Sequence, residues 1–374
     1  MITYREGLLG LHICDMFRIS GSVVPKALFW SLPSAALAGC LWYYFRGDDE
    51  SSSKPVSRVF NGYSFILGFM IVFRMQLAYQ RFWEAATLTN ELRSEWLDCV
   101  QTTFAFCSGA PEKKAEVEKF QHLLVRLVSM LHRSAIERLN MNEDEALPVI
   151  DNSSIYSLEF LGEHCDRCEI IYSWILRLLV QKLKEGVLAI PPPVLGRSFQ
   201  ELGAGLAKLH NVMKITTIPI PFPYVQMGSF LLLFHWALTP IMASLIMKNA
   251  RWSAALAFMS VFCLWAIYYI AAEIEQPFGK HQNSLPCCDM QEELNRMMII
   301  MLAEESQEPP EFDMSSVKMD RVSVVKQKTG RKTERQLMAS RTKELQGEDV
   351  PFSVIDSSGP SSGPTKAWGA KDID

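Results

Sequence analysis

The chain has 374 residues and a formal net charge of −4; 21% of its residues are charged and 49% are hydrophobic. Soluble domains usually carry about 25% charged residues, and here the charges are unevenly spread, because long apolar runs alternate with polar segments. No basic cluster is dense enough to predict nucleic-acid binding. No GxSxG, Walker-type, HExxH or GxGxxG motif indicates an enzyme or a bound cofactor.

The first 24 residues form an expected N-terminal arm, which lacks the basic start and apolar core of a signal peptide. A membrane helix needs about 20 mostly apolar residues, and residues 25–45 meet this requirement. Lys26 stands at the start of this run, and Trp42, Tyr43 and Tyr44 form an aromatic belt at its end. We therefore predict the first membrane span here.

The second expected span, residues 60–80, carries phenylalanine at every fourth position: Phe65, Phe69 and Phe73. Steps of four residues advance about 400° along a helix, so the three rings lie within about 80° of arc. One interpretation is lipid contact or core packing. The other is a pore constriction, in which several subunits around an axis stack these rings. Ring edges carry partial positive charge, and a narrow apolar collar can gate by dewetting.

The long polar middle of the chain predicts cytosolic helices over about residues 87–215, because apolar residues recur at helical spacing in 112–140, 156–188 and 199–213. Cys165 and Cys168 form a CxxC next to His164. A zinc site normally has four ligands, and the second half of such a set is missing. We therefore predict no metal site and ordinary packing thiols.

A proline-rich segment, ITTIPIPFPY, precedes the third expected span at residues 224–247. Pro219, Pro221 and Pro223 lack the N–H that would continue a helix, and they leave backbone carbonyls free. This predicts a break that ends at Tyr224. The break is either a rigid re-entry turn or a non-helical segment near a pore.

The fourth expected span, residues 254–272, is followed by two acids, Glu273 and Glu275, and then by Pro277 and Gly279, which stop the helix. The acids are either solvated or packed against another subunit or the N-terminal arm. Residues 307–374 lose helical periodicity and become polar, then Ser-, Gly- and Pro-rich, which is typical of a disordered tail.

Four spans place both termini on one side of the membrane. That side, with the middle region, holds 32 of the 37 lysines and arginines. Positive residues favour the cytosolic face, so the termini are expected in the cytosol or its equivalent. The sequence predicts an all-α membrane protein with four transmembrane helices and a large helical cytosolic region.

Four of these motifs, taken together, resemble the bestrophin family of anion channels over about residues 10–300. ISGSVVPKAL, residues 19–28, is similar to the family's Arg-x-x-Gly-Ser-Val segment before the first span, and IPIPFPY resembles the lead into the third. EIEQPFG, which includes Phe278, resembles the element after the fourth. The second span resembles the stretch of the bacterial and plant branch through Phe73, Arg74, Tyr79, Arg81, Phe82, Trp83 and Glu84.

The resemblance implies a homopentamer in a lipid bilayer, with one axial pore for chloride, other small monovalent anions and, in some members, bicarbonate. The family's neck falls on Phe65, Phe69 and Phe73, and Ile190 is our candidate for a second, cytosolic constriction. Arg74 and Arg81 would bias the potential towards anions, unless Arg81 pairs with Glu84 and holds the helix bundle together. Animal members of the family clasp calcium with a run of acids directly after the glycine that corresponds to Gly279. Here Lys280 follows, so we expect no calcium gating of that form.

We therefore predict a bestrophin-like channel domain over residues 25–306 that conducts anions passively. A thylakoid and a plasma membrane fit the sequence equally well. The alternative is a non-conducting membrane scaffold that recruits partners through the cationic tail segment Lys318 to Lys343. A secondary transporter should show inverted repeats, and the two halves show none.

Overall fold

The computed structural model describes residues 6–7, 10–11, 21–45, 50–139, 147, 149–150, 160–161 and 166–310. The chain divides into two units, one that ends at Pro309 and one that begins at Pro310. Only the first is described below. Of the expected tail, residues 307–374, only residues 307–310 are described; the rest, including the cationic segment of the scaffold alternative, lies outside the described residues.

The described part is α-helical, as predicted, apart from a hairpin of two short strands and one isolated bridge. The strands are β1 (Glu6–Gly7) and β2 (Gly10–Leu11). The helices are α2 (Val24–Tyr44), α3 (Glu50–Ala105), the 3₁₀ turn η1 (Pro111–Lys113), α4 (Lys114–Leu139), α6 (Arg167–Lys184), α7 (Pro192–Thr217), α8 (Phe222–Ile246), α9 (Ala250–Ile274), α10 (Cys287–Met301) and α11 (Glu304–Gln307).

Four of these helices are long and apolar enough to cross a membrane: α2, α3, α8 and α9. Prolines occupy the first turn of α2, α7 and α8, where the missing N–H costs no hydrogen bond. The second span and the first cytosolic helix are not separate elements. They form one helix, α3, because no proline or glycine occurs between residues 69 and 105 to end it.

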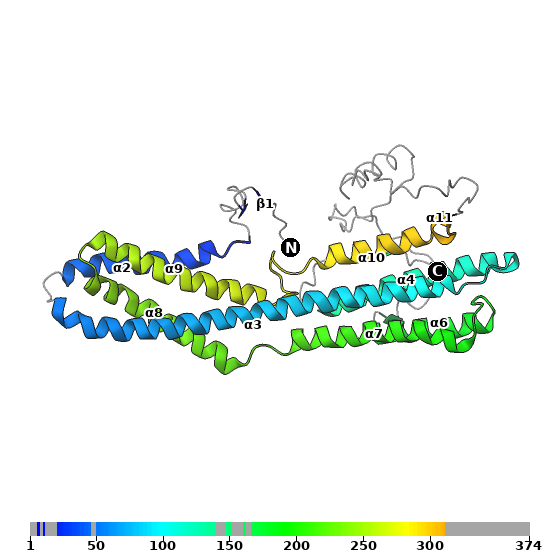
Figure 1. Cartoon of the computed structure of the whole chain (residues 1–374), viewed down its shortest axis with the longest axis horizontal. Helices are drawn as coiled ribbons and strands as arrows, with labels where there is room; N and C mark the ends of the chain where they lie inside the picture. The colour runs from blue at the N-terminus through cyan, green and yellow to red at the C-terminus, as the bar shows by residue number, and fades with distance from the viewer. Residues whose placement is uncertain are drawn as a thin grey trace, which may run out of the picture. The chain divides into compact units, whose positions relative to one another are not determined.

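The helix α3 connects the two halves of the first unit. Helices α2, α8 and α9 pack together along its first half, and α4, α7 and α10 pack against its second half (Figure 1). In the spanning half, buried side chains such as Leu67 and Val261 form a small core, and many large apolar side chains face outward, including Phe29, Phe230 and Met259. A surface of this kind suits lipid.

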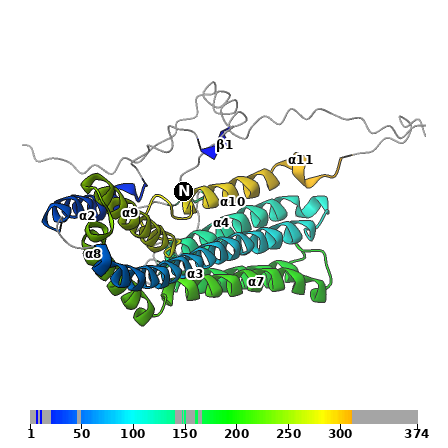
Figure 2. The same cartoon turned by 60° about the vertical axis from the view of Figure 1, so that its left-hand side comes forward.

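The helices α3 and α7 run side by side in close contact (Figure 2). Gly205 of α7 lies directly against the fully buried ring of Trp96. The Trp96 Nε1 donates a hydrogen bond to the carbonyl of Leu202 at 3.3 Å. Two polar contacts extend the pairing, Thr103 with Ser198 and Lys208 with Glu91. The two helices are therefore joined at several levels.

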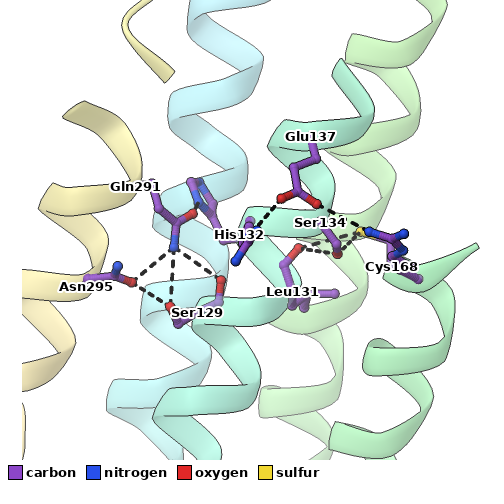
Figure 3. A network of polar contacts seen from close by, with 10 residues as sticks. Ser129, Leu131, His132, Ser134, Glu137, Cys168, Gln291 and Asn295 are labelled. Carbon is purple, nitrogen blue, oxygen red and sulfur yellow. Dashed lines mark hydrogen bonds and ion pairs between the residues drawn. The ribbon is translucent and has the colours of Figure 1, made fainter. Parts of the chain in front are cut away.

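A buried polar network joins α4 to α10 (Figure 3). The His132 Nδ1 lies 2.5 Å from the Gln291 Oε1, and the Gln291 amide donates to the Ser129 carbonyl at 3.2 Å. The Ser129 hydroxyl donates to the Asn295 Oδ1 at 2.7 Å. Complete burial of the imidazole lowers the pKa of His132 to about 4. The network therefore holds a neutral histidine at neutral pH.

Candidate functional site

The phenylalanine positions singled out in the sequence form an exposed line on α3. Phe65, Phe69 and Phe73 are 77%, 67% and 47% exposed, whereas Leu67 and Ile71 on the opposite side are buried. The rings of Phe69 and Phe73 stack with centroids 6.4 Å apart. These three residues, called the collar below, point away from the chain's own bundle. These side chains therefore do not pack in the core of their own subunit, and the remaining contact partners are lipid and another copy of the chain.

The exposed line continues past the collar without a break. Gln76, Gln80, Trp83 and Thr87 follow at steps of three or four residues, and all are exposed. Such steps keep side chains on one face of a helix. Trp83 also stacks on the Tyr79 ring, with centroids 6.4 Å apart. The apolar collar is thus followed on the same face by neutral polar side chains and one tryptophan.

Arg74 lies on the opposite face of α3 from this line. Its guanidinium is buried, with one Nη 3.1 Å from a Glu275 carboxylate oxygen and the Cζ 4.6 Å from the centre of the Tyr268 ring. Buried cations need such partners. Because Glu275 neutralises it inside the bundle, Arg74 connects α3 to the end of α9 and does not project its charge onto the exposed line.

Arg81 satisfies backbone groups that the proline motif leaves free. Pro219 has no N–H to donate to the carbonyl of Ile215, four residues earlier. One Arg81 Nη donates to that carbonyl at 2.6 Å, and the other donates to the Ile218 carbonyl at 2.8 Å. Arg81 therefore caps α7 and does not pair with Glu84, which was one of the two alternatives for it; the Glu84 side chain is exposed.

The proline motif forms a short non-helical link between α7 and α8. Pro221 is the residue before α8, and Pro223 lies in its first turn. The hydroxyl of the next residue, Tyr224, donates to the Met70 carbonyl at 3.0 Å, and its ring packs edge-on against Phe73 at 6.1 Å. The link thus places a tyrosine behind the last ring of the collar.

The two acids at the C-terminal end of α9, Glu273 in its last turn and Glu275 directly after it, pair within the chain. A Glu273 oxygen lies 2.8 Å from the Lys26 Nζ, and the other accepts from the Asn283 amide at 3.2 Å. That amide also donates to the Gly21 carbonyl at 3.0 Å, which ties the turn to the N-terminal arm. Beyond the acids, Pro277, Phe278 and Gly279 are all buried. Phe278 packs in the core of the second half of the bundle.

Ile190 and the cysteine motif lie in the second half. Ile190 is half-buried in the loop between α6 and α7. Cys168 is buried and accepts from the Ser134 hydroxyl at 3.3 Å, and burial raises the pKa of its thiol to about 11. His164 and Cys165 lie outside the described residues. Within the described residues, no group of three His, Cys, Asp or Glu side chains gathers to hold a metal.

Two arrangements in the second half of the bundle could not be predicted from the sequence. The contact between Gly205 and Trp96 depends on two residues far apart in the chain, and a single glycine in a helix has no local signal for close packing. The network around His132 consists of polar residues in the middle of amphipathic helices. The helical pattern of the sequence does not show whether a polar side chain at such a position is buried or exposed.

The four apolar helices define a helical integral membrane protein. Residues 10–299 match the family described as Bacterial/Fungal Bestrophin protein, and the chain belongs to this family.

Two curated relatives are named as voltage-dependent anion channel-forming proteins. The protein from Synechocystis sp. is 26% identical over 251 residues, which cover 63% of this chain and 75% of the relative. The protein from Nostoc sp. is 25% identical over 282 residues, which cover 72% and 85%. A crystal structure of a variant of a bacterial bestrophin homologue from Klebsiella pneumoniae shares the fold, with a TM-score of 0.61 and 16% identity over 76% of this chain and 100% of that chain.

Proposed function

We propose that this protein is an anion-selective channel that conducts small monovalent anions, chloride first and bicarbonate as a further candidate, through the axis of a homopentamer. The observation that carries the proposal is the exposed collar on α3, which faces away from its own bundle. Five copies around an axis would turn Phe65, Phe69 and Phe73 into three stacked rings. The names of the two cyanobacterial relatives support anions as the conducted species.

In this proposal the aromatic edges, rather than arginines, favour anions in the neck. All three arginines between residues 65 and 94 are engaged elsewhere: Arg74 with Glu275, Arg81 with α7, and Arg93 with Glu293 and Asn90. The free-energy cost of removing water from the anion would be offset by the partly positive ring edges turned towards it. Because the collar is apolar, it would also exclude water and cations at its narrowest level.

Beyond the collar the ion would meet polar side chains. Gln76 and Gln80 carry amide N–H donors that can replace lost water around an anion, and Thr87 adds a hydroxyl. These groups are neutral, so they would hold an anion weakly enough for it to leave. Conduction would then be passive, driven by the electrochemical gradient.

The test is anion-replacement recording in planar bilayers, chloride against bicarbonate, on purified wild type and Phe69→Ala. We expect the variant to change the current and the permeability ratio, because it widens the middle ring of the collar. Phe29→Ala removes an equally exposed phenylalanine from α2 and should leave both unchanged. Identical currents and ratios for wild type and Phe69→Ala would refute the neck assignment. Native mass spectrometry should give five copies per particle.

A further inference from the structure

The loop that carries Ile190 is built around a left-handed glycine. Gly186 has φ of +72°, a conformation in which a Cβ crowds the following carbonyl. The amides of Val187 and Leu188 both donate to the Lys182 carbonyl, at 3.0 and 3.3 Å, and so close the end of α6. The side chains of Val187 and Leu188 are buried. The turn is therefore well packed, and its direction depends on Gly186.

The same loop is hydrogen-bonded to the segment directly after α3. The Ser108 amide donates to the Val187 carbonyl at 2.8 Å, and the Ala189 amide donates to the Phe106 carbonyl at 2.9 Å. These bonds form an antiparallel bridge, the only isolated one among the described residues. Ile190 is the next residue along the chain. The helix that carries the collar thus also anchors the loop that carries Ile190.

An added methyl group at position 186 would meet no described atom within 4 Å. A substitution there therefore acts through the backbone conformation and not through a clash with neighbouring side chains. Asparagine tolerates the left-handed region far better than alanine does. This gives a matched pair of variants that differ in backbone preference.

We propose that Gly186 is a positioning residue for Ile190. Its left-handed turn would align the loop with the bridge to the end of α3 and so set how far Ile190 reaches into the pathway. The inference rests on the proposed function and on the expectation, drawn from the family resemblance, that Ile190 of each copy narrows the pore below the collar. It adds that one helix, α3, fixes the position of both narrow points.

The test compares full-length wild type, Gly186→Ala, Gly186→Asn and Ile190→Ala in planar bilayers, with chloride, nitrate and thiocyanate as the probe anions. We expect Gly186→Ala to shift the thiocyanate-to-chloride permeability ratio by about twofold or more, in the same direction as Ile190→Ala, because the constriction changes size. Gly186→Asn should keep the wild-type ratio. A variant that only weakened folding would lower the amount of channel without moving this ratio.

Amide hydrogen exchange tests the bridge independently of conduction. The amides of Ser108 and Ala189 should be protected in wild type and Gly186→Asn, and should exchange faster in Gly186→Ala.

A wild-type ratio in Gly186→Ala, or an equal shift in Gly186→Asn, would overturn the inference while the proposed function stands. Rapid exchange of these two amides in wild type would also overturn it, even if Gly186→Ala does not assemble. Absence of any anion current in wild type would instead overturn the proposed function and this inference with it.

Discussion

Replacement of Gly205 by alanine tests the contact that holds α7 against α3. An alanine Cβ at this position would stand 2.5 Å from the Cδ1 of Trp96 and closer still to its Nε1, well inside van der Waals contact. The indole cannot move aside easily, because it is fully buried and hydrogen-bonded to the Leu202 carbonyl. The two helices would have to separate locally.

The size of the effect follows from two opposing contributions. Overpacking a well-packed core costs about 1–3 kcal/mol. Alanine stabilises a helix interior by up to about 1 kcal/mol relative to glycine. Gly203→Ala is the matched control on the same helix, because its Cβ would meet only the Tyr172 hydroxyl at an ordinary 3.5 Å. The free energies of unfolding of the two variants should therefore differ by about 1–3 kcal/mol.

The assay is thermal unfolding of detergent-solubilised protein, followed by tryptophan fluorescence and by the fraction that stays monodisperse. We expect Gly205→Ala to melt below wild type and Gly203→Ala to melt at or above it. In the double variant Trp96→Leu/Gly205→Ala, the two changes should cost less than their sum, because the smaller side chain removes the clash. Equal melting temperatures for the two alanine variants would refute the close contact.

Three further predictions concern charge. The folded-state pKa of His132, about 4 against an ordinary 6.5, means that the unfolded chain takes up the proton first. About 3 kcal/mol of stability, complete above pH 6.5, should be lost as the pH falls to 4, and melting curves of His132→Gln should lack this loss. Glu275→Ala leaves Arg74 buried without its carboxylate and should lower the free energy of unfolding by about 3 kcal/mol or more. The control, Glu304→Ala, breaks an exposed pair with Lys114 and should leave the melting temperature unchanged. Equal shifts in melting temperature for the two variants would contradict this prediction. Micromolar calcium should not activate the purified channel, and a calcium titration that shows activation would disprove that expectation.

The parts of the fold that depend on residues close together in the sequence could be predicted from it. Runs of apolar residues predicted four spans, and four helices of the required length and apolarity are present. The break between α7 and α8 was also predictable, because Pro219 lacks the N–H that a helix needs, whatever the tertiary structure around it. The continuity of α3 was missed because its surface changes from apolar to polar near residue 80, whereas nothing in its backbone changes.

The partners of the two motif arginines could not be predicted in the same way. Arg74 contacts Glu275, 201 residues later, and Arg81 contacts Ile218, 137 residues later. A charge beside an apolar run is equally compatible with a pore wall and with a buried pair, and only the tertiary arrangement distinguishes them.

Because α3 is unbroken, the number of residues in it is as important for the position of its side chains as their identity. Its 56 residues span about 84 Å at 1.5 Å each, well beyond the roughly 30 Å of a bilayer's hydrocarbon core. One residue inserted between Phe73 and Trp83 would rotate everything after it by about 100°. Trp83 would leave the exposed line, and Trp96 would turn away from Gly205. Insertions and deletions are therefore expected to be tolerated in the loops of this protein and excluded from the middle of α3.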